Sequence, residues 1–147
     1  MTWWCVPLEK PWQWLWRPYP GAWLLAVVLV GLYVASTRRH GDGDARSRGR
    51  YLLGVAVLWL ASDWPLATLA AGYLASAHMA QYLLYTIAAA PLLLLGVTEP
   101  MARRALARSR MGRLAHLVSR PLVAGAVYNA TLFATHAPWT VDTLRAT

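Results

Sequence analysis

The chain of 147 residues is 58% hydrophobic and only 14% charged. Soluble domains carry about 25% charged residues, so this composition excludes an ordinary soluble protein and indicates one embedded in a lipid bilayer. The formal net charge of +8 would suggest nucleic-acid binding in a soluble chain. Here the arginines lie in two segments between apolar runs, where membrane topology explains them, and we expect no nucleic-acid partner.

Residues 1–20 form a segment rich in Trp and Pro. Each proline disfavours helix at the residue before it, and indoles concentrate at the membrane–water interface. We expect an irregular interfacial segment, with a docking lip for a substrate or partner as the alternative. The segment lacks the pattern of a standard signal peptide. Cys5 is the only cysteine, which excludes an intramolecular disulfide.

The fold class expected is an all-α membrane protein, a bundle of four transmembrane helices in a single domain over residues 1–147. The four helices are expected near residues 21–37, 51–69, 76–96 and 118–136. The third has 21 residues without a formal charge, and crossing a hydrocarbon core of about 30 Å takes roughly 20 helical residues. The second helix must continue past Pro65 to cross, so we expect a kink there.

Two Arg-rich segments, 38–50 and 97–120, follow the first and third helices, whereas the link between the second and third is uncharged. The positive-inside rule places both basic segments in the cytoplasm and therefore both termini outside. The Gly-Asp-Gly-Asp stretch at 41–44 is typical of a turn. We expect residues 40–50 to form a solvated loop and not a metal site.

This topology brings His78, His136 and Asp63 to the outer face. Imidazole and thioether groups both suit copper, but His78 and Met79 point about 100° apart on a helix. Tyr82 shares the face of His78 one turn later. The alternative is that each histidine packs at headgroup level and bonds a carbonyl or water. No catalytic motif is present, and we do not expect an enzyme.

Residues 76–82 (SAHMAQY) and 89–96 (AAPLLLLG) resemble the CtaG family of cytochrome c oxidase assembly factors, whose pattern is S-A-H-M-x-Q-H followed by A-P-L-L-L-L-G. The sequence THAP at 135–138 is similar to the H-x-P of that family. The resemblance implies a multi-pass protein of the bacterial plasma (inner) membrane that matures a haem–copper oxidase. It also implies an oxidase subunit as partner.

The resemblance further implies copper as the cargo, with His78, Met79 and His136 as the metal ligands on the outer face. We add Asp63 and Tyr82 as supporting candidates because of their positions. The chain departs from the family where Tyr82 replaces a second histidine. A histidine pair at i and i+4 would chelate one ion, whereas a His/Tyr pair is a weaker copper site.

Family members usually have more spanning helices, so the chain resembles the N-terminal part of that fold. A truncated form, a homo-oligomer or a partner chain is therefore expected. Two other functions remain open. One is a membrane subunit that binds haem through His78 and His136. The other is a transporter or structural subunit without metal.

Overall fold

The computed structural model describes Trp14, Trp16, residues 18–41 and 43–107, Gly112, Leu117 and residues 120–137. This part of the chain is helical with short connections and contains no strand, which confirms the all-α class. The chain divides into two compact units, residues 1–101 and 102–147, and each is described by itself.

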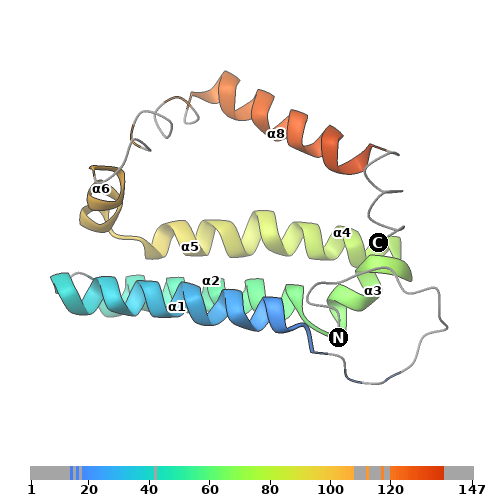
Figure 1. The fold of residues 1–147 in the computed structure, drawn as a ribbon, viewed down its shortest axis with the longest axis horizontal. Coiled ribbons are helices and arrows are strands. Elements are labelled where there is room, and N and C mark those ends of the chain that lie inside the picture. The colour runs from blue at the N-terminus through green and yellow to red at the C-terminus, as the bar shows by residue number, and fades with distance from the viewer. Residues whose placement is uncertain are drawn as a thin grey trace. The chain divides into compact units, whose positions relative to one another are not determined.

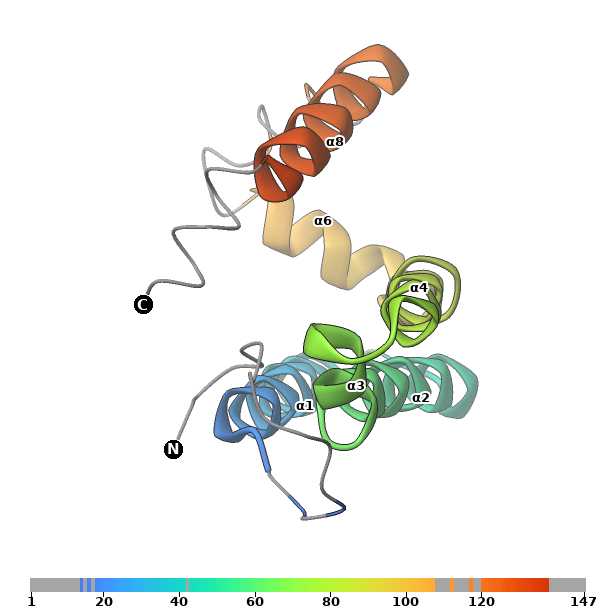
Figure 2. The same ribbon diagram turned by 90° about the vertical axis from the view of Figure 1, so that its right-hand side faces the viewer.

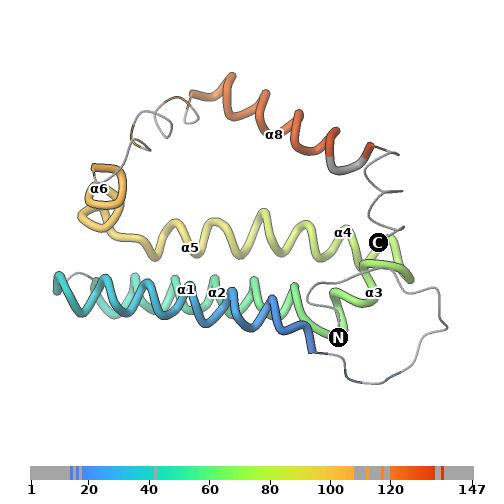
Figure 3. Tube along the Cα trace, viewed as in Figure 1, coloured from blue at the N-terminus to red at the C-terminus, as the bar shows by residue number. Residues whose placement is uncertain are grey.

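The first unit is built from three roughly parallel rods (Figure 1). Its elements are α1 (Pro20–His40), α2 (Ala45–Ser62), α3 (Leu66–Gly72), α4 (Ala75–Leu83), the π-helix η1 (Leu84–Ala89), α5 (Ala90–Gly96) and the start of α6 (Glu99–Ala107). The elements α4, η1 and α5 form one continuous rod (Figure 3). The end-on view in Figure 2 shows α2 as the middle rod, which contacts α1 on one side and the α4–α5 rod on the other.

The turn between α1 and α2 is shorter than the sequence suggested. The first helix ends at Gly41, which has a φ of 68° and donates its N–H to the Thr37 carbonyl at 2.9 Å. The second begins after Asp44, whose carboxylate accepts the Ser47 N–H at 3.0 Å as an N-cap. Most of the expected loop at 40–50 is therefore helix. Arginine is a good helix former, so the charged flanks extend both helices.

The second expected helix, 51–69, is broken as well as kinked. It starts earlier, at Ala45, ends at Ser62, and resumes as α3 at Leu66 with a bend of 47°. The break follows from Pro65, which cannot donate an N–H to the preceding turn. The Trp64–Pro65 peptide bond is cis.

The rod formed by α4, η1 and α5 agrees closely with the expected third helix, 76–96. Its π-helical turn lies directly before Pro91, whose ring would clash with the Ile87 carbonyl in a regular α-helix. Beyond the wider turn, the Ala90 N–H bonds to the Tyr85 carbonyl five residues back. The rod therefore passes the proline without breaking.

The core at the α1–α2 turn is centred on two stacked tyrosines. The rings of Tyr33 and Tyr51 lie 4.0 Å apart at an interplanar angle of 12°. The Tyr33 hydroxyl donates to the Gly96 carbonyl at 3.1 Å, and the Tyr51 hydroxyl donates to the Leu29 carbonyl at 3.3 Å. A Cβ on Gly96 would lie 2.5 Å from the Cβ of Tyr51. Glycine is thus required where α5 meets α2.

Within the part of the chain that the structure describes, two helices are long and apolar enough to cross a bilayer, Pro20–His40 and Ala75–Gly96. The bent pair of α2 and α3 makes a third if it counts as one span. In the second unit, α8 (Pro121–His136) is apolar but has only 16 residues, against the roughly 20 that a span needs. It begins at Pro121 and not at 118, because Arg120 is extended and proline takes the first helical position.

Candidate functional site

The first unit has one end where four elements meet. The start of α1, the end of α2, α3 and the first turn of α4 all lie there (Figure 1). This end carries Asp63, His78 and Met79, which the sequence singled out. The arginines at the α1–α2 turn lie at the opposite end of the rods. The expected grouping of Asp63 with the start of the third helix is therefore present within this unit.

Asp63 joins the start of α1 to the end of α2. One carboxylate oxygen accepts the backbone N–H of Tyr19 at 3.1 Å, and the other accepts the indole N–H of Trp23 at 3.0 Å. The residue is only 4% exposed. Beside it, the hydroxyls of Tyr19 and Thr68 lie 2.8 Å apart in a hydrogen bond. A buried carboxylate needs such donors, and through them Asp63 links the start of α1 to the end of α2.

Gln81 on α4 donates a hydrogen bond to a backbone carbonyl that the break in α2 leaves without a donor. In a continuous helix the Ala61 carbonyl would accept the N–H of residue 65, but that residue is proline. The Gln81 side-chain amide instead donates to the Ala61 carbonyl at 2.7 Å. The same nitrogen also donates to the Tyr85 hydroxyl at 3.0 Å, one turn further along the rod in η1. Gln81 thus caps α2 from a neighbouring helix.

A short chain of hydrogen bonds extends from this cap. The Ser62 hydroxyl donates to the Leu58 carbonyl at 2.7 Å, so its oxygen is left to accept. The Tyr85 hydroxyl lies 2.9 Å from that oxygen and therefore donates to it. Sequence reasoning missed Gln81, Ser62 and Tyr85. Two features of the sequence could have predicted them. Pro65 leaves the carbonyl four residues earlier without its helical donor, and Gln81 and Tyr85 are spaced at i and i+4.

The proposed ligands His78 and Met79 lie on the exposed side of α4. His78 is exposed, and 57% of the Met79 surface is accessible. Tyr82 is half-buried, and its carbonyl accepts the Thr86 hydroxyl at 2.8 Å. Among the described residues, no three of His, Cys, Asp and Glu gather closely enough to hold a metal ion. The first unit therefore offers donors on an open helical turn.

The third proposed ligand, His136, is the last residue of α8 in the second unit. Its side chain lies outside the described residues, as do Cys5 and Pro138. Most of the interfacial segment at 1–20 is outside them too. The described tryptophans of that segment, Trp14 and Trp16, are exposed.

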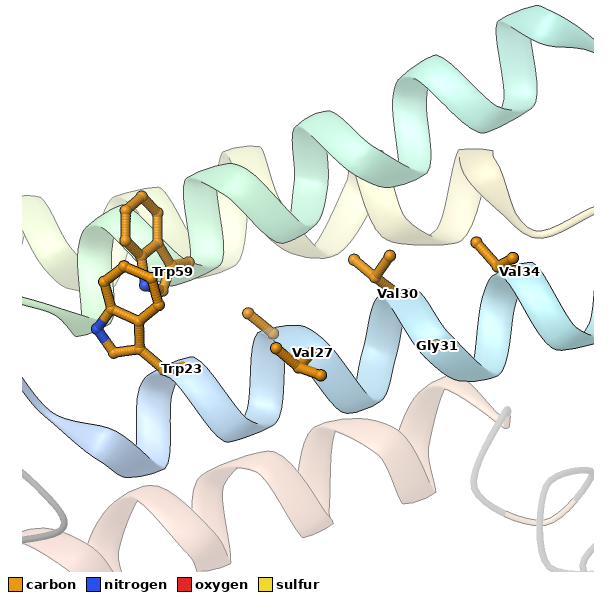
Figure 4. Close-up of a pocket in the computed structure, with 7 residues that line it drawn as sticks. Trp23, Val27, Val30, Gly31, Val34 and Trp59 are labelled. Carbon is orange, nitrogen blue, oxygen red and sulfur yellow. The ribbon is translucent and has the colours of Figure 1, made fainter.

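A groove also runs along α1, on the face that includes the Trp23 and Trp59 rings (Figure 4). Its volume is about 580 Å³, and its lining comprises Trp23, Ala26, Val27, Val30, Gly31, Val34 and Trp59. The two indoles meet edge to face at 4.7 Å. The groove contains no ligand-type side chain, so we assign it to the lipid-facing surface and not to the site.

Comparison with known proteins gives one match. The family model for the cytochrome c oxidase caa3 assembly factor (Caa3_CtaG) matches residues 31–147. The matched range contains Asp63, the segment 76–82 and His136. No curated protein and no solved structure matches the chain.

Proposed function

Because the chain belongs to the cytochrome c oxidase caa3 assembly factor family, we propose that it matures a haem–copper oxidase by binding or delivering copper at the outer membrane face. Membership confirms the resemblance carried by residues 76–82 and implies a role in oxidase assembly. It also suggests a non-catalytic role. The copper, its ligands and the face of the membrane are the parts that we add.

The observation that carries the proposal is the exposure of His78 and Met79 together on the first turn of α4. An imidazole and a thioether are donors that copper accepts, and the thioether favours Cu(I). Their side chains diverge on the helix, so they form an incomplete ligand set. An incomplete and accessible set suits cargo that must be handed on. We propose His136 as a further ligand, with Asp63 and Tyr82 as supporting residues.

We also propose that the bundle has four spans, the fourth being α8, with both termini outside the bacterial plasma membrane. The charges support this topology, because Arg-rich segments follow α1 and α5 while the link from α3 to α4 is uncharged. An oxidase subunit is the proposed recipient. The exposed apolar faces of this bundle support packing against a partner chain or a second copy.

The test is Cu(I) binding by the detergent-purified protein in competition with a chelator. We expect near-stoichiometric copper in the wild type and at least about tenfold weaker binding in His78→Ala, since each ligand is part of a small set. Met79→Leu, which keeps the side-chain volume, should weaken binding too. His40→Ala is the matched control, because His40 is exposed at the opposite end of α1.

Wild-type protein that binds no copper, or a His40→Ala variant as weak as His78→Ala, would contradict the copper site. A Soret band in the purified protein would instead support the haem alternative. Cells that lack the protein should contain oxidase deficient in copper. That second measurement separates an assembly role from adventitious copper binding in detergent.

A further inference from the structure

The α1–α2 turn carries a dense set of exposed positive charges. Five arginines lie within its two helix ends, with Arg38 and Arg39 closing α1 and Arg46, Arg48 and Arg50 opening α2. All five are exposed. Across the residues that the structure describes, none of the five forms an ion pair with a carboxylate. Five exposed guanidinium groups are therefore gathered at this end of the first unit.

The helices hold these charges in fixed positions. Only residues 41–44 separate α1 from α2, so the arginines stand on helical backbone and not on a loop. Arg46 and Arg50 are one turn apart and share a face of α2. The carboxylate of the nearest described acid, Asp44, accepts hydrogen bonds from the Ser47 side chain and from the Ser47 N–H, and these lower the pKa of the carboxyl group. Asp44 caps the helix, and of the five arginines only Arg46 contributes to lowering the pKa of its carboxyl group.

The length of the basic turns of α2 can be compared with the thickness of the headgroup layer of a membrane. The basic turns of α2, residues 45–50, rise about 9 Å at 1.5 Å per residue. They end at Tyr51, where the buried contacts begin. The polar layer on each side of a bilayer is about 5–7 Å thick, half the difference between its total and its hydrocarbon thickness. With Tyr51 at the edge of the hydrocarbon core, the basic turns of α2 would extend through this polar layer and about 2 Å beyond it.

We propose that the exposed arginines of the α1–α2 turn bind the headgroups of anionic phospholipids. A guanidinium presents two parallel N–H donors that match the oxygens of a phosphate group. Basic residues beside a spanning helix are attracted to anionic lipids in the same leaflet. This surface lies at the opposite end of the first unit from His78, so the inference does not depend on copper binding.

The experiment measures lipid binding by the full chain in detergent, using native mass spectrometry with phosphatidylglycerol and phosphatidylcholine of identical acyl chains. We expect the wild type to prefer phosphatidylglycerol, and the variant Arg46→Gln/Arg50→Gln to lose about tenfold or more of that preference. The preference should also fall at 1 M salt, where the screening length is about 3 Å.

The matched control, Arg110→Gln/Arg113→Gln, removes the same charge from the other basic segment and should keep the preference. Arg46→Lys/Arg50→Lys should retain most of it, which guards against a folding defect. Equal loss in the Arg110/Arg113 control, or no preference in the wild type, would overturn the proposal. Glycerophosphate that displaces the lipid at equal concentration would also overturn it, because the site would then recognise a free anion.

Discussion

Replacing Gln81 by methionine tests whether a side chain on α4 caps the broken end of α2. Methionine keeps the unbranched shape of glutamine but has no N–H to donate. The Ala61 carbonyl would lose the donor now 2.7 Å away. Pro65 cannot replace that donor, because it has no N–H. Tyr85 would keep its bond to Ser62, so the orphaned carbonyl is the main consequence.

The expected cost is about 1–2 kcal/mol in the free energy of unfolding. Leaving a buried acceptor unsatisfied costs about 1–3 kcal/mol. Hydrogen bonds between membrane helices average about 0.6 kcal/mol and reach about 1.7, because the unfolded chain in the membrane also finds partners. We therefore take the lower half of the range for an unsatisfied buried acceptor. The expected cost stays above the average of about 0.6 kcal/mol because the Ala61 carbonyl has no other donor within its own helix.

The assay is reversible unfolding of the reconstituted protein in detergent mixtures, followed by far-UV circular dichroism. Tyr85→Phe is the matched control and should cost less, because it leaves the Gln81–Ala61 bond in place. Pro65→Ala supplies an N–H one turn after Ala61, so Gln81→Met should cost less in that background, with a coupling of about 1 kcal/mol. An unchanged unfolding free energy in Gln81→Met, or no coupling, would refute the capping role.

Three further outcomes follow from the packing and the caps. Gly96→Ala should destabilise the protein by about 1–3 kcal/mol, because its Cβ would meet the Tyr51 backbone at 2.6 Å. The control Gly31→Ala adds a Cβ with no atom within 4 Å and should be neutral or stabilising in the same unfolding assay. Asp63→Ala should lower the free energy of unfolding by about 2–3 kcal/mol, because it leaves two donors without an acceptor. A variant that loses copper binding but keeps full stability would contradict this structural role of Asp63. The pKa of Asp44 is lower in the folded protein than its ordinary value of 3.8. Its cap therefore stabilises α2 fully at pH values above 3.8, and this stabilisation is lost as the pH falls through the folded pKa. Protection of the first turn of α2 from hydrogen exchange, taken relative to the intrinsic exchange rate at each pH, should therefore fall at acid pH in the wild type, and Asp44→Ala should show no such step.

The sequence predicted the rods and the proline sites well because those signals are local. An uncharged stretch of 21 residues predicts a helix without reference to the rest of the chain, and the third expected helix agrees with the structure to within one residue. A proline removes one N–H wherever it stands, which is why a disturbance was expected at Pro65, and the same rule accounts for the π-turn before Pro91. Only the form of the disturbance, a break in one case and a π-turn in the other, depended on the neighbours.

The partners of the polar groups were not predictable in the same way. Asp63 and Trp23 are 40 residues apart, and Gln81 and Ala61 are 20 apart. Each pairing depends on how α1, α2 and α4 lie side by side, which hydrophobic pattern alone does not specify. The arginines were misread as loop for a different reason. Their charge suggests exposure, which is correct, but exposure does not prevent helix formation.

The motif at 76–82 divides into two roles once its helix is placed. Gln81 faces α2 and Ala77 is buried one turn earlier, whereas Met79 lies about 160° around the helix from Gln81 and is exposed. The inward residues fix the first turn of α4 against the break in α2. The outward residues then stand at a fixed place on that end of the unit. On our proposal, Gln81, which caps α2, is distinct from His78 and Met79, which bind copper. Loss of the Gln81 cap should therefore weaken folding first and copper binding only through it.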